Sequence, residues 1–334
     1  MSVRLLDCTL RDGGHVNKAD FGADTIKGIV NSLVKSQVNI IELGFLKNTR
    51  YSKDTALFAE IEYAYGVLPE EINSTEFSLM IRPDVFDAKN ISPYCGKIKY
   101  IRLAFYYEDL PLALHTGDSL RNKGYTCIFN PVNIMGYDAQ TMSKLLTELN
   151  NFKPYAVTIV DTFGAMMPND LNKILNLFHE YLNPSICIGL HPHENLCMSF
   201  ALAQIFIEKE HSMRDIIVDA SLMGMGRAPG NLPIELLINY MNQVYGKGYC
   251  LSSIMNVIEE YILPIRKKYS WGYSPAYFLS AKQKAHRSYV EHLLSRGCSL
   301  PEIEAVSDAI TVDKRIKFDK DYADALLHNI KEYN

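Results

Sequence analysis

The feature that most constrains the fold is a repeated alternation of short apolar segments with longer amphipathic ones. Eight runs rich in β-branched and aliphatic residues are typical of buried strands, and segments with apolar residues at spacings of three and four separate them. This order predicts βα units around a parallel sheet. Eight such units over about 245 residues match a (β/α)8 TIM barrel in number and length.

The expected strands cover residues 3–10, 38–45, 76–81, 98–105, 125–132, 155–162, 186–193 and 215–222. Helices are expected between them at 24–35, 55–66, 111–122, 138–150, 169–181 and 196–211. A doubly wound open sheet is the main structural alternative, but no G-x-G-x-x-G follows the first strand. The strand pattern stops near Tyr249, which predicts a catalytic barrel over 1–249 and a mostly helical C-terminal region over 250–334.

Composition narrows the classes of function. With 48% hydrophobic residues the chain can bury a large core, and its net charge of -4 argues against nucleic-acid binding. Its 7 cysteines are scattered and read as reduced thiols. The early charged segment leaves no room for a signal peptide, and no apolar run approaches the roughly 18 residues of a membrane span. We expect a cytoplasmic protein that does not bind membranes and acts on a small metabolite.

Unusual polar residues gather where the expected strands end, which is the functional face of a (β/α)8 barrel. His191 and His193 are two residues apart at the end of the seventh strand, so both imidazoles are expected to face the barrel mouth. With Asp12 they would form a set of three ligands that leaves positions on a divalent ion open for substrate. Mn²⁺ or Mg²⁺ is expected. Two histidines bonded to carbonyl groups are the alternative.

Three further residues of the mouth suit catalysis. Arg11 could stabilise an enolate oxygen, and Glu42 could hold its guanidinium in place; a simple ion pair between the two is compatible with both roles. His15, on a Gly-Gly turn, is expected to be mobile, with a pKa near the operating pH, as suits a general base. A solvated loop histidine is the alternative.

Two residues are candidates for substrate contacts beside Arg11. Thr162 ends the sixth strand, and Asn231 lies in the glycine-rich segment "GMGRAPGN" before a helix expected to begin near Leu232. Asn231 could offer its amide oxygen to the metal or cap that helix, and capping is the safer interpretation.

Five segments carry a resemblance to a known family. "DCTLRDGGH", "IIELGF", "VDTFGAMMP", "GLHPHENL" and "GMGRAPGN" together resemble the metal-dependent lyase and aldolase superfamily that includes 3-hydroxy-3-methylglutaryl-CoA lyase, isopropylmalate synthase and 4-hydroxy-2-oxovalerate aldolase. The resemblance spans about residues 3–245. It implies metal ligation by Asp12, His191 and His193, with Asn231 as a further candidate, and it pairs Arg11 with Glu42.

The residue after the glycine pair indicates which branch of this superfamily the sequence resembles most. Acyl-CoA condensing members carry a motif like "TLRDGEQ", whereas "RDGGH" is similar to the pyruvate aldolases, in which this histidine takes a proton from the substrate's 4-hydroxyl. The resemblance therefore implies that His15 is that base. The aldolases also bring a tyrosine from beyond the barrel to the substrate, and "WGYSPAYF" offers Tyr273 or Tyr277.

The sequence thus predicts a metal-dependent aldolase that splits a 4-hydroxy-2-oxo acid into pyruvate and an aldehyde, or joins them. A Claisen-type acyltransferase using acetyl-CoA and a non-catalytic binding barrel are the alternatives. The resemblance also implies an aldehyde dehydrogenase partner, but the segment "AHRSYVEHLLSRGCSLPEIEAVSDAI" resembles the docking region of the dehydrogenase-linked aldolases poorly, which weakens that prediction. Assembly into a homo-oligomer is left open.

Overall fold

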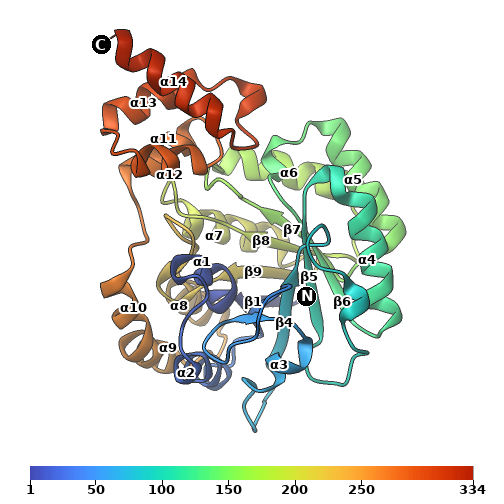
Figure 1. The fold of residues 1–334 in the computed structure, drawn as a ribbon. Coiled ribbons are helices and arrows are strands. Elements are labelled where there is room, and N and C mark those ends of the chain that lie inside the picture. The colour runs from blue at the N-terminus through green and yellow to red at the C-terminus, as the bar shows by residue number, and fades with distance from the viewer. Residues whose placement is uncertain (334) are drawn as a thin grey trace.

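The computed structural model describes residues 1–333 and contains a closed barrel of eight parallel strands (Figure 1). Strand β1 pairs with both β9 and β2, which closes the sheet. The expected (β/α)8 barrel is confirmed. Its strands are β1 (Val3–Asp7), β2 (Ile40–Leu46), β4 (Glu76–Ile81), β5 (Tyr100–Phe105), β6 (Thr126–Pro131), β7 (Ala156–Val160), β8 (Cys187–His191) and β9 (Ile216–Ala220).

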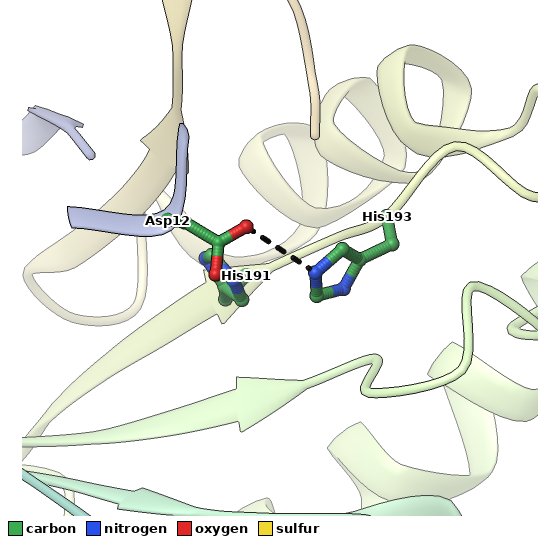
Figure 2. Close-up of side chains that lie close together, drawn as sticks. All are labelled: Asp12, His191 and His193. Carbon is green, nitrogen blue, oxygen red and sulfur yellow. Dashed lines mark ion pairs between the residues drawn. The ribbon is translucent and has the colours of Figure 1, made fainter. Parts of the chain in front are cut away.

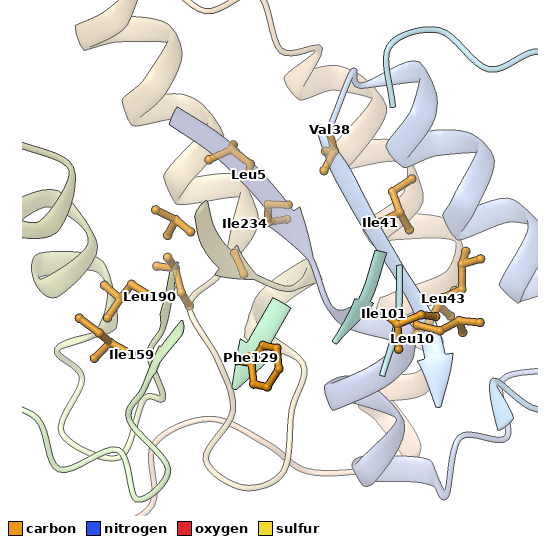
Figure 3. Packing of buried hydrophobic residues seen from close by; sticks show 14 of the residues in the cluster. Leu5, Leu10, Val38, Ile41, Leu43, Ile101, Phe129, Ile159, Leu190 and Ile234 are labelled. Atoms are coloured by element: carbon orange, nitrogen blue, oxygen red, sulfur yellow. The ribbon is translucent and has the colours of Figure 1, made fainter. Parts of the chain in front are cut away.

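The barrel helices lie outside the strands. They are α2 (Ala23–Lys35), α3 (Ile61–Tyr65), α4 (Leu110–Asn122), α5 (Ala139–Phe152), α6 (Pro168–Tyr181), α7 (Ser199–Glu210) and α8 (Ile234–Tyr245). Each apolar stripe packs on the sheet, and side chains such as Ile41, Leu190 and Ile234 form the main core between the two layers (Figure 3).

Two units depart from the regular pattern. The helix expected at 55–66 is reduced to α3, because residues 57 and 58 form strand β3 (Leu57–Phe58), which pairs with the end of β2. After β4 the chain forms only one turn of 3₁₀-helix, Ala88–Asn90. Pro83 and Pro93 flank that turn, and proline disfavours a continuous helix there.

A second core fills the lower part of the barrel. Leu6, Ile40, Tyr100 and Ile217 belong to it, and all point inward from their strands. Side chains alternate along a strand, so residues two positions further on also point inward, one layer closer to the mouth. That layer is polar. It includes Glu42, Arg102 and Asp219, which are all fully or almost fully buried.

The C-terminal region divides into two parts. Helices α9 (Leu251–Val257) and α10 (Leu263–Lys268), joined by the π-helical turn Ile258–Ile262, lie on the flank beside α2 and α8. Helices α11 (Pro275–Lys282), α12 (Ser288–Ser295), α13 (Leu300–Ala309) and α14 (Lys320–Tyr333) have a small core of their own (Figure 1, orange to red). We call this second part the C-terminal cap.

The C-terminal cap contacts loops that follow the later barrel strands. Lys317 pairs with Glu108 after β5 at 2.6 Å. The ring of His286 meets that of Phe163 after β7 at 5.6 Å. The cap therefore contacts the β5 to β9 side of the mouth, and its Arg287 also acts electrostatically on Asp12 and His15 after β1. None of the helices within residues 1–333 has the length and hydropathy that a membrane span requires.

Candidate active site

The site begins where β1 ends. The strand was expected to continue to Leu10, but it stops at Asp7, and Thr9–Gly13 form a π-helical turn. The N–H groups of Arg11 and Asp12 both donate to the carbonyl of Cys8, at 3.1 and 2.8 Å. In a strand, consecutive side chains point to opposite faces, but in this helical turn they need not. Two consecutive side chains, Arg11 and Asp12, are therefore both buried at the mouth.

The structure brings Asp12, His191 and His193 together (Figure 2). One ligand atom from each residue lies within 4.8 Å of the others, and all three residues are buried. The nearest approach between the Asp12 carboxylate and His193 is 3.7 Å, from Oδ2 to Nε2. Of the histidines, His191 is the last residue of β8, and His193 lies just beyond it.

Each histidine has an oxygen atom of an aspartate close to its Nδ1. His193 Nδ1 lies 2.7 Å from the carbonyl oxygen of Asp161 and donates to it, which leaves Nε2 with its lone pair. His191 Nδ1 lies 3.0 Å from Asp219 Oδ2. Burial lowers the pKa of His191, although Asp219 opposes the shift. A neutral imidazole with one nitrogen held by an acceptor is the usual state of a metal-ligating histidine.

Several buried polar atoms around this group have no hydrogen-bond partner within the described residues: Asp12 Oδ2, His193 Nε2 and Asn231 Oδ1. Buried polar atoms are costly when unsatisfied, so three of them in one place indicate a missing ligand. Carboxylate, imidazole and amide-oxygen donors all suit a divalent cation. The residues therefore fit a divalent metal.

Asn231 does not cap a helix, so that prediction was wrong. Helix α8 begins at Ile234, and Asn231 Nδ2 donates to the carbonyl of Met225 at 3.0 Å. A Cβ added to Gly226 would lie 2.5 Å from Asn231 Nδ2 and 3.0 Å from Asp12 Oδ2. The glycine thus permits a close approach that places the amide of Asn231 beside the carboxylate of Asp12.

A chain of buried charges holds Arg11 in place. Its Nε lies 2.6 Å from Glu42 Oε2, and its Nη1 lies 2.5 Å from Asp12 Oδ1. Burial alone would raise the pKa of Asp12, but the charge of Arg11 and contacts with the two histidines hold it well below its usual range. The expected pairing of Arg11 with Glu42 is present, and Asp12 stays ionised.

The sequence analysis did not identify two further residues of this network of buried charges, Arg102 and Asp219. Arg102 Nη1 lies 3.1 Å from Glu42 Oε2, and its Nη2 pairs with Asp219, which in turn approaches His191. Both Arg102 and Asp219 stand alone as charged residues in apolar strands, two positions after an inward-pointing residue. That spacing was the signal that could have identified them.

His15 is an exposed residue whose ring contacts a neighbouring aromatic side chain. It lies in the short helix α1 (Gly14–Asn17), and its ring meets the edge of Phe45 at 5.8 Å. Desolvation by the surrounding protein lowers its pKa to about 4, and nearby arginines add to the shift. The lowered pKa leaves the imidazole neutral at pH 7, although His15 is exposed at the pocket wall. It remains reachable because it lines an open pocket with Arg11.

The remaining predicted residues are not members of the metal-ligand group. The hydroxyl of Thr162 lies after β7 and accepts from the N–H of Asn133 at 2.7 Å. Tyr273 is 57% exposed, in the segment that leads into the C-terminal cap. Tyr277 lies in α11 and is half-buried. Burial and the charge of Glu291 raise the pKa of Tyr277.

Tyr277 is close to loops of the mouth. Its carbonyl oxygen lies 3.5 Å from the side-chain nitrogen of Asn195 after β8. Arg227, in the loop after β9, forms an ion pair with Glu291 of α12. Its positive charge also acts to lower the pKa of Tyr277. Of the two tyrosines that the sequence offered, Tyr277 is the less exposed, and its backbone contacts a loop of the mouth.

Comparisons with known proteins agree with this architecture. Residues 115–259 match the family model described as HMGL-like. The chain is 24% identical to a 4-hydroxy-2-oxovalerate aldolase from Stutzerimonas stutzeri over 86% of each chain.

Solved structures show the same fold. The N-terminal domain of a candidate aldolase from Bacteroides vulgatus matches with a TM-score of 0.74 at 24% identity, covering 87% of this chain and 96% of that one. An HMG-CoA lyase from Brucella melitensis matches with a TM-score of 0.62 at 15% identity, covering 79% and 99%. Together with the five ordered motifs and the closed barrel, these similarities relate the chain to the HMGL-like TIM-barrel proteins.

Proposed function

We propose that this protein is a divalent-metal-dependent pyruvate aldolase acting on a 4-hydroxy-2-oxo acid. The observation that carries the proposal is the position of His15. Its imidazole lines the same pocket as Arg11, and Arg11 is bonded directly to Asp12 of the buried metal-ligand group. A base, a fixed cation and a metal centre at one mouth are what aldol cleavage beside a 2-oxo group requires.

In this proposal Asp12, His191 and His193 hold the metal, with Asn231 Oδ1 as a further donor. A bound divalent ion supplies Lewis acidity to the 2-oxo acid. Mn²⁺ or Mg²⁺ is proposed, since two imidazoles and one carboxylate accept either. Arg11, together with Thr162 and Asn231, is proposed to contact the substrate.

The chain's own residues perform the proton transfer. His15 is unprotonated at neutral pH, so it can accept the proton of the 4-hydroxyl. The C3–C4 bond then breaks and releases the aldehyde, and the guanidinium of Arg11, clamped by Glu42, stabilises the charge on the enolate oxygen. Because Glu42 is buried and also bonded to Arg102, Arg11 needs no reorganisation as that charge develops.

The proposal is tested by incubating the metal-supplemented protein with a panel of 4-hydroxy-2-oxo acids and measuring pyruvate release. We expect at least one member to give metal-dependent pyruvate. A parallel incubation with acetyl-CoA and a 2-oxo acid tests the acyltransferase alternative. Release of CoA without pyruvate formation in the first assay would favour that alternative.

Tyr277 is proposed to contribute a hydroxyl to the substrate. Replacing Tyr277 with phenylalanine should lower kcat/KM by about 10-fold or more, the loss expected for one hydrogen bond to a charged group. The matched Tyr273→Phe variant should stay within about 2-fold, because Tyr273 is exposed. Steady-state kinetics of both variants decide between them, and the reverse pattern would reassign the role to Tyr273.

Three finer points are also proposals. The 7 cysteines are all free, which favours a cytoplasmic location. An aldehyde dehydrogenase partner and a homo-oligomer rest only on the family resemblance. Co-purification and light scattering at micromolar concentration would test them.

A further inference from the structure

The β1 to β4 side of the barrel mouth contains a pocket of about 470 Å³. Its wall comes from the segment after β1, the end of β2, the short strand β3 and the segment after β4, and it includes Arg11 and His15. This volume is within the range of small-molecule sites. If His15 takes the proton of the 4-hydroxyl, the carbon bearing that hydroxyl lies beside it. The remainder of the aldehyde half then extends into this pocket, because His15 forms part of its wall.

The pocket combines apolar walls with positive charge. Phe45, Leu57 and Val85 supply apolar surface. Lys18, Lys47 and Arg82 supply cations, and none of the described residues that line the pocket is acidic. A neutral, short-chain aldehyde would use only the apolar part of such a site.

Two of these cations lack a counter-charge within residues 1–333. Arg82 is paired with Asp84 at 2.5 Å, whereas Lys18 and Lys47 have no ion pair there. Lys18 directly follows α1, and it lines the pocket together with His15. Positively charged side chains without a counter-charge around a pocket attract an anionic ligand.

The backbone beneath both lysines is fixed. The N–H of Lys47 donates to the carbonyl of Phe58 at 2.9 Å, through the short strand β3. The N–H of Lys18 donates to the carbonyl of Gly14. The backbone of each lysine is therefore held by a hydrogen bond, and the two lysines lie on separate elements. Both line the pocket that contains His15, the candidate base.

We propose that the aldehyde half of the substrate carries a terminal carboxylate or phosphate, and that Lys18 and Lys47 bind it. The inference rests on the proposed aldolase function and names the substrate class of that site. In cleavage, the C3–C4 bond breaks and the 4-hydroxyl proton passes to His15. The bonding pair stays on the pyruvate fragment, which then takes up one proton. The anionic group does not react; it positions the hydroxyl-bearing carbon.

The test compares matched aldehydes in condensation with pyruvate, using the full chain with Mn²⁺ added. One pair is glyceraldehyde 3-phosphate and glyceraldehyde, and the other is succinic semialdehyde and butanal. We expect the wild type to favour an anionic member by about 10-fold or more in kcat/KM. The arm with the larger preference distinguishes phosphate from carboxylate.

Substitutions assign the preference to the lysines. Lys18→Met with Lys47→Met should lower kcat/KM for the anionic aldehyde by about 10- to 100-fold, and that for its neutral partner by no more than about 2-fold. The control is Lys27→Met with Lys53→Met, which removes the same charge from exposed positions outside the pocket. It should leave the anionic preference intact.

Exchange of the pyruvate methyl protons with solvent, measured in the same samples, separates the two hypotheses. Condensation that favours the neutral aldehydes, or an anionic preference that survives in the Lys18 and Lys47 variant, would overturn the inference while leaving the aldolase in place. Absence of both exchange and condensation with all four aldehydes would overturn the proposed function, and the inference with it.

Discussion

The Asp12→Asn variant should lose divalent-metal affinity by at least about 100-fold, because removing a partner behind the ligands of a metal site already costs about 10- to 100-fold. Asparagine keeps the shape of the side chain but removes the negative charge that sits 3.7 Å from His193. Elemental analysis after dialysis, and titration against a competing chelator, measure the loss.

Thermal unfolding gives a second readout of the same variant. A ligand that binds only the folded state raises Tm, and the rise grows with the logarithm of the ligand concentration divided by Kd. Added Mn²⁺ should therefore raise Tm of the wild type and have little effect on Asp12→Asn. His179 provides the matched control, because it lies on α6 and bonds to Glu210, outside the metal-ligand group. His179→Asn should keep the metal response.

A double substitution tests the metal hypothesis even if the remaining ligands still bind the ion after a single substitution. Asp12→Asn combined with His191→Asn removes two of the three candidate ligands. A folded double variant that retained stoichiometric metal and full activity would place the metal elsewhere. A loss of metal in the double variant alone would indicate that Asn231 Oδ1 or solvent replaces one ligand.

The fold could be predicted because buried parallel strands appear in the sequence as apolar runs, which can be recognised without knowing their tertiary contacts. All eight strands lie within one residue of the expected ranges, but several are shorter. The first ends at Asp7 because Cys8 accepts hydrogen bonds from the following turn. Local patterns do not reveal such a competition between a strand and a tight turn, and the same is true of β3.

The site was predicted less completely than the fold. Asp12, His191 and His193 stand out because each lies at a strand end with metal-ligand chemistry. The pair between Arg102 and Asp219 joins residues 117 positions apart, and it depends on the register of strands that do not neighbour each other. The pKa of His15 depends on how much of the surrounding protein desolvates its ring, which no local pattern records.

The His15→Ala variant should lose aldol cleavage by about 10²- to 10⁴-fold, the range for a positioned general base. Decarboxylation of oxaloacetate forms the same pyruvate enolate without a hydroxyl to deprotonate. The variant should therefore keep that reaction nearly intact. His15 lies at the end of an open pocket and has no hydrogen bond to the Arg11 and Glu42 network, so its removal should leave the charge chain in place.

Arg11→Lys provides the contrast, because it removes the fixed guanidinium that both reactions would use. One lysine nitrogen cannot reproduce the two contacts of Arg11 with Glu42 and Asp12, although the charge is retained. Both activities should fall by about 10²- to 10³-fold, as when a single donor to a developing oxyanion is lost. Steady-state rates of the two reactions in the two variants are the measurement. Equal losses of both activities in His15→Ala would contradict a role confined to the hydroxyl proton, since only the cleavage has a proton for His15 to take.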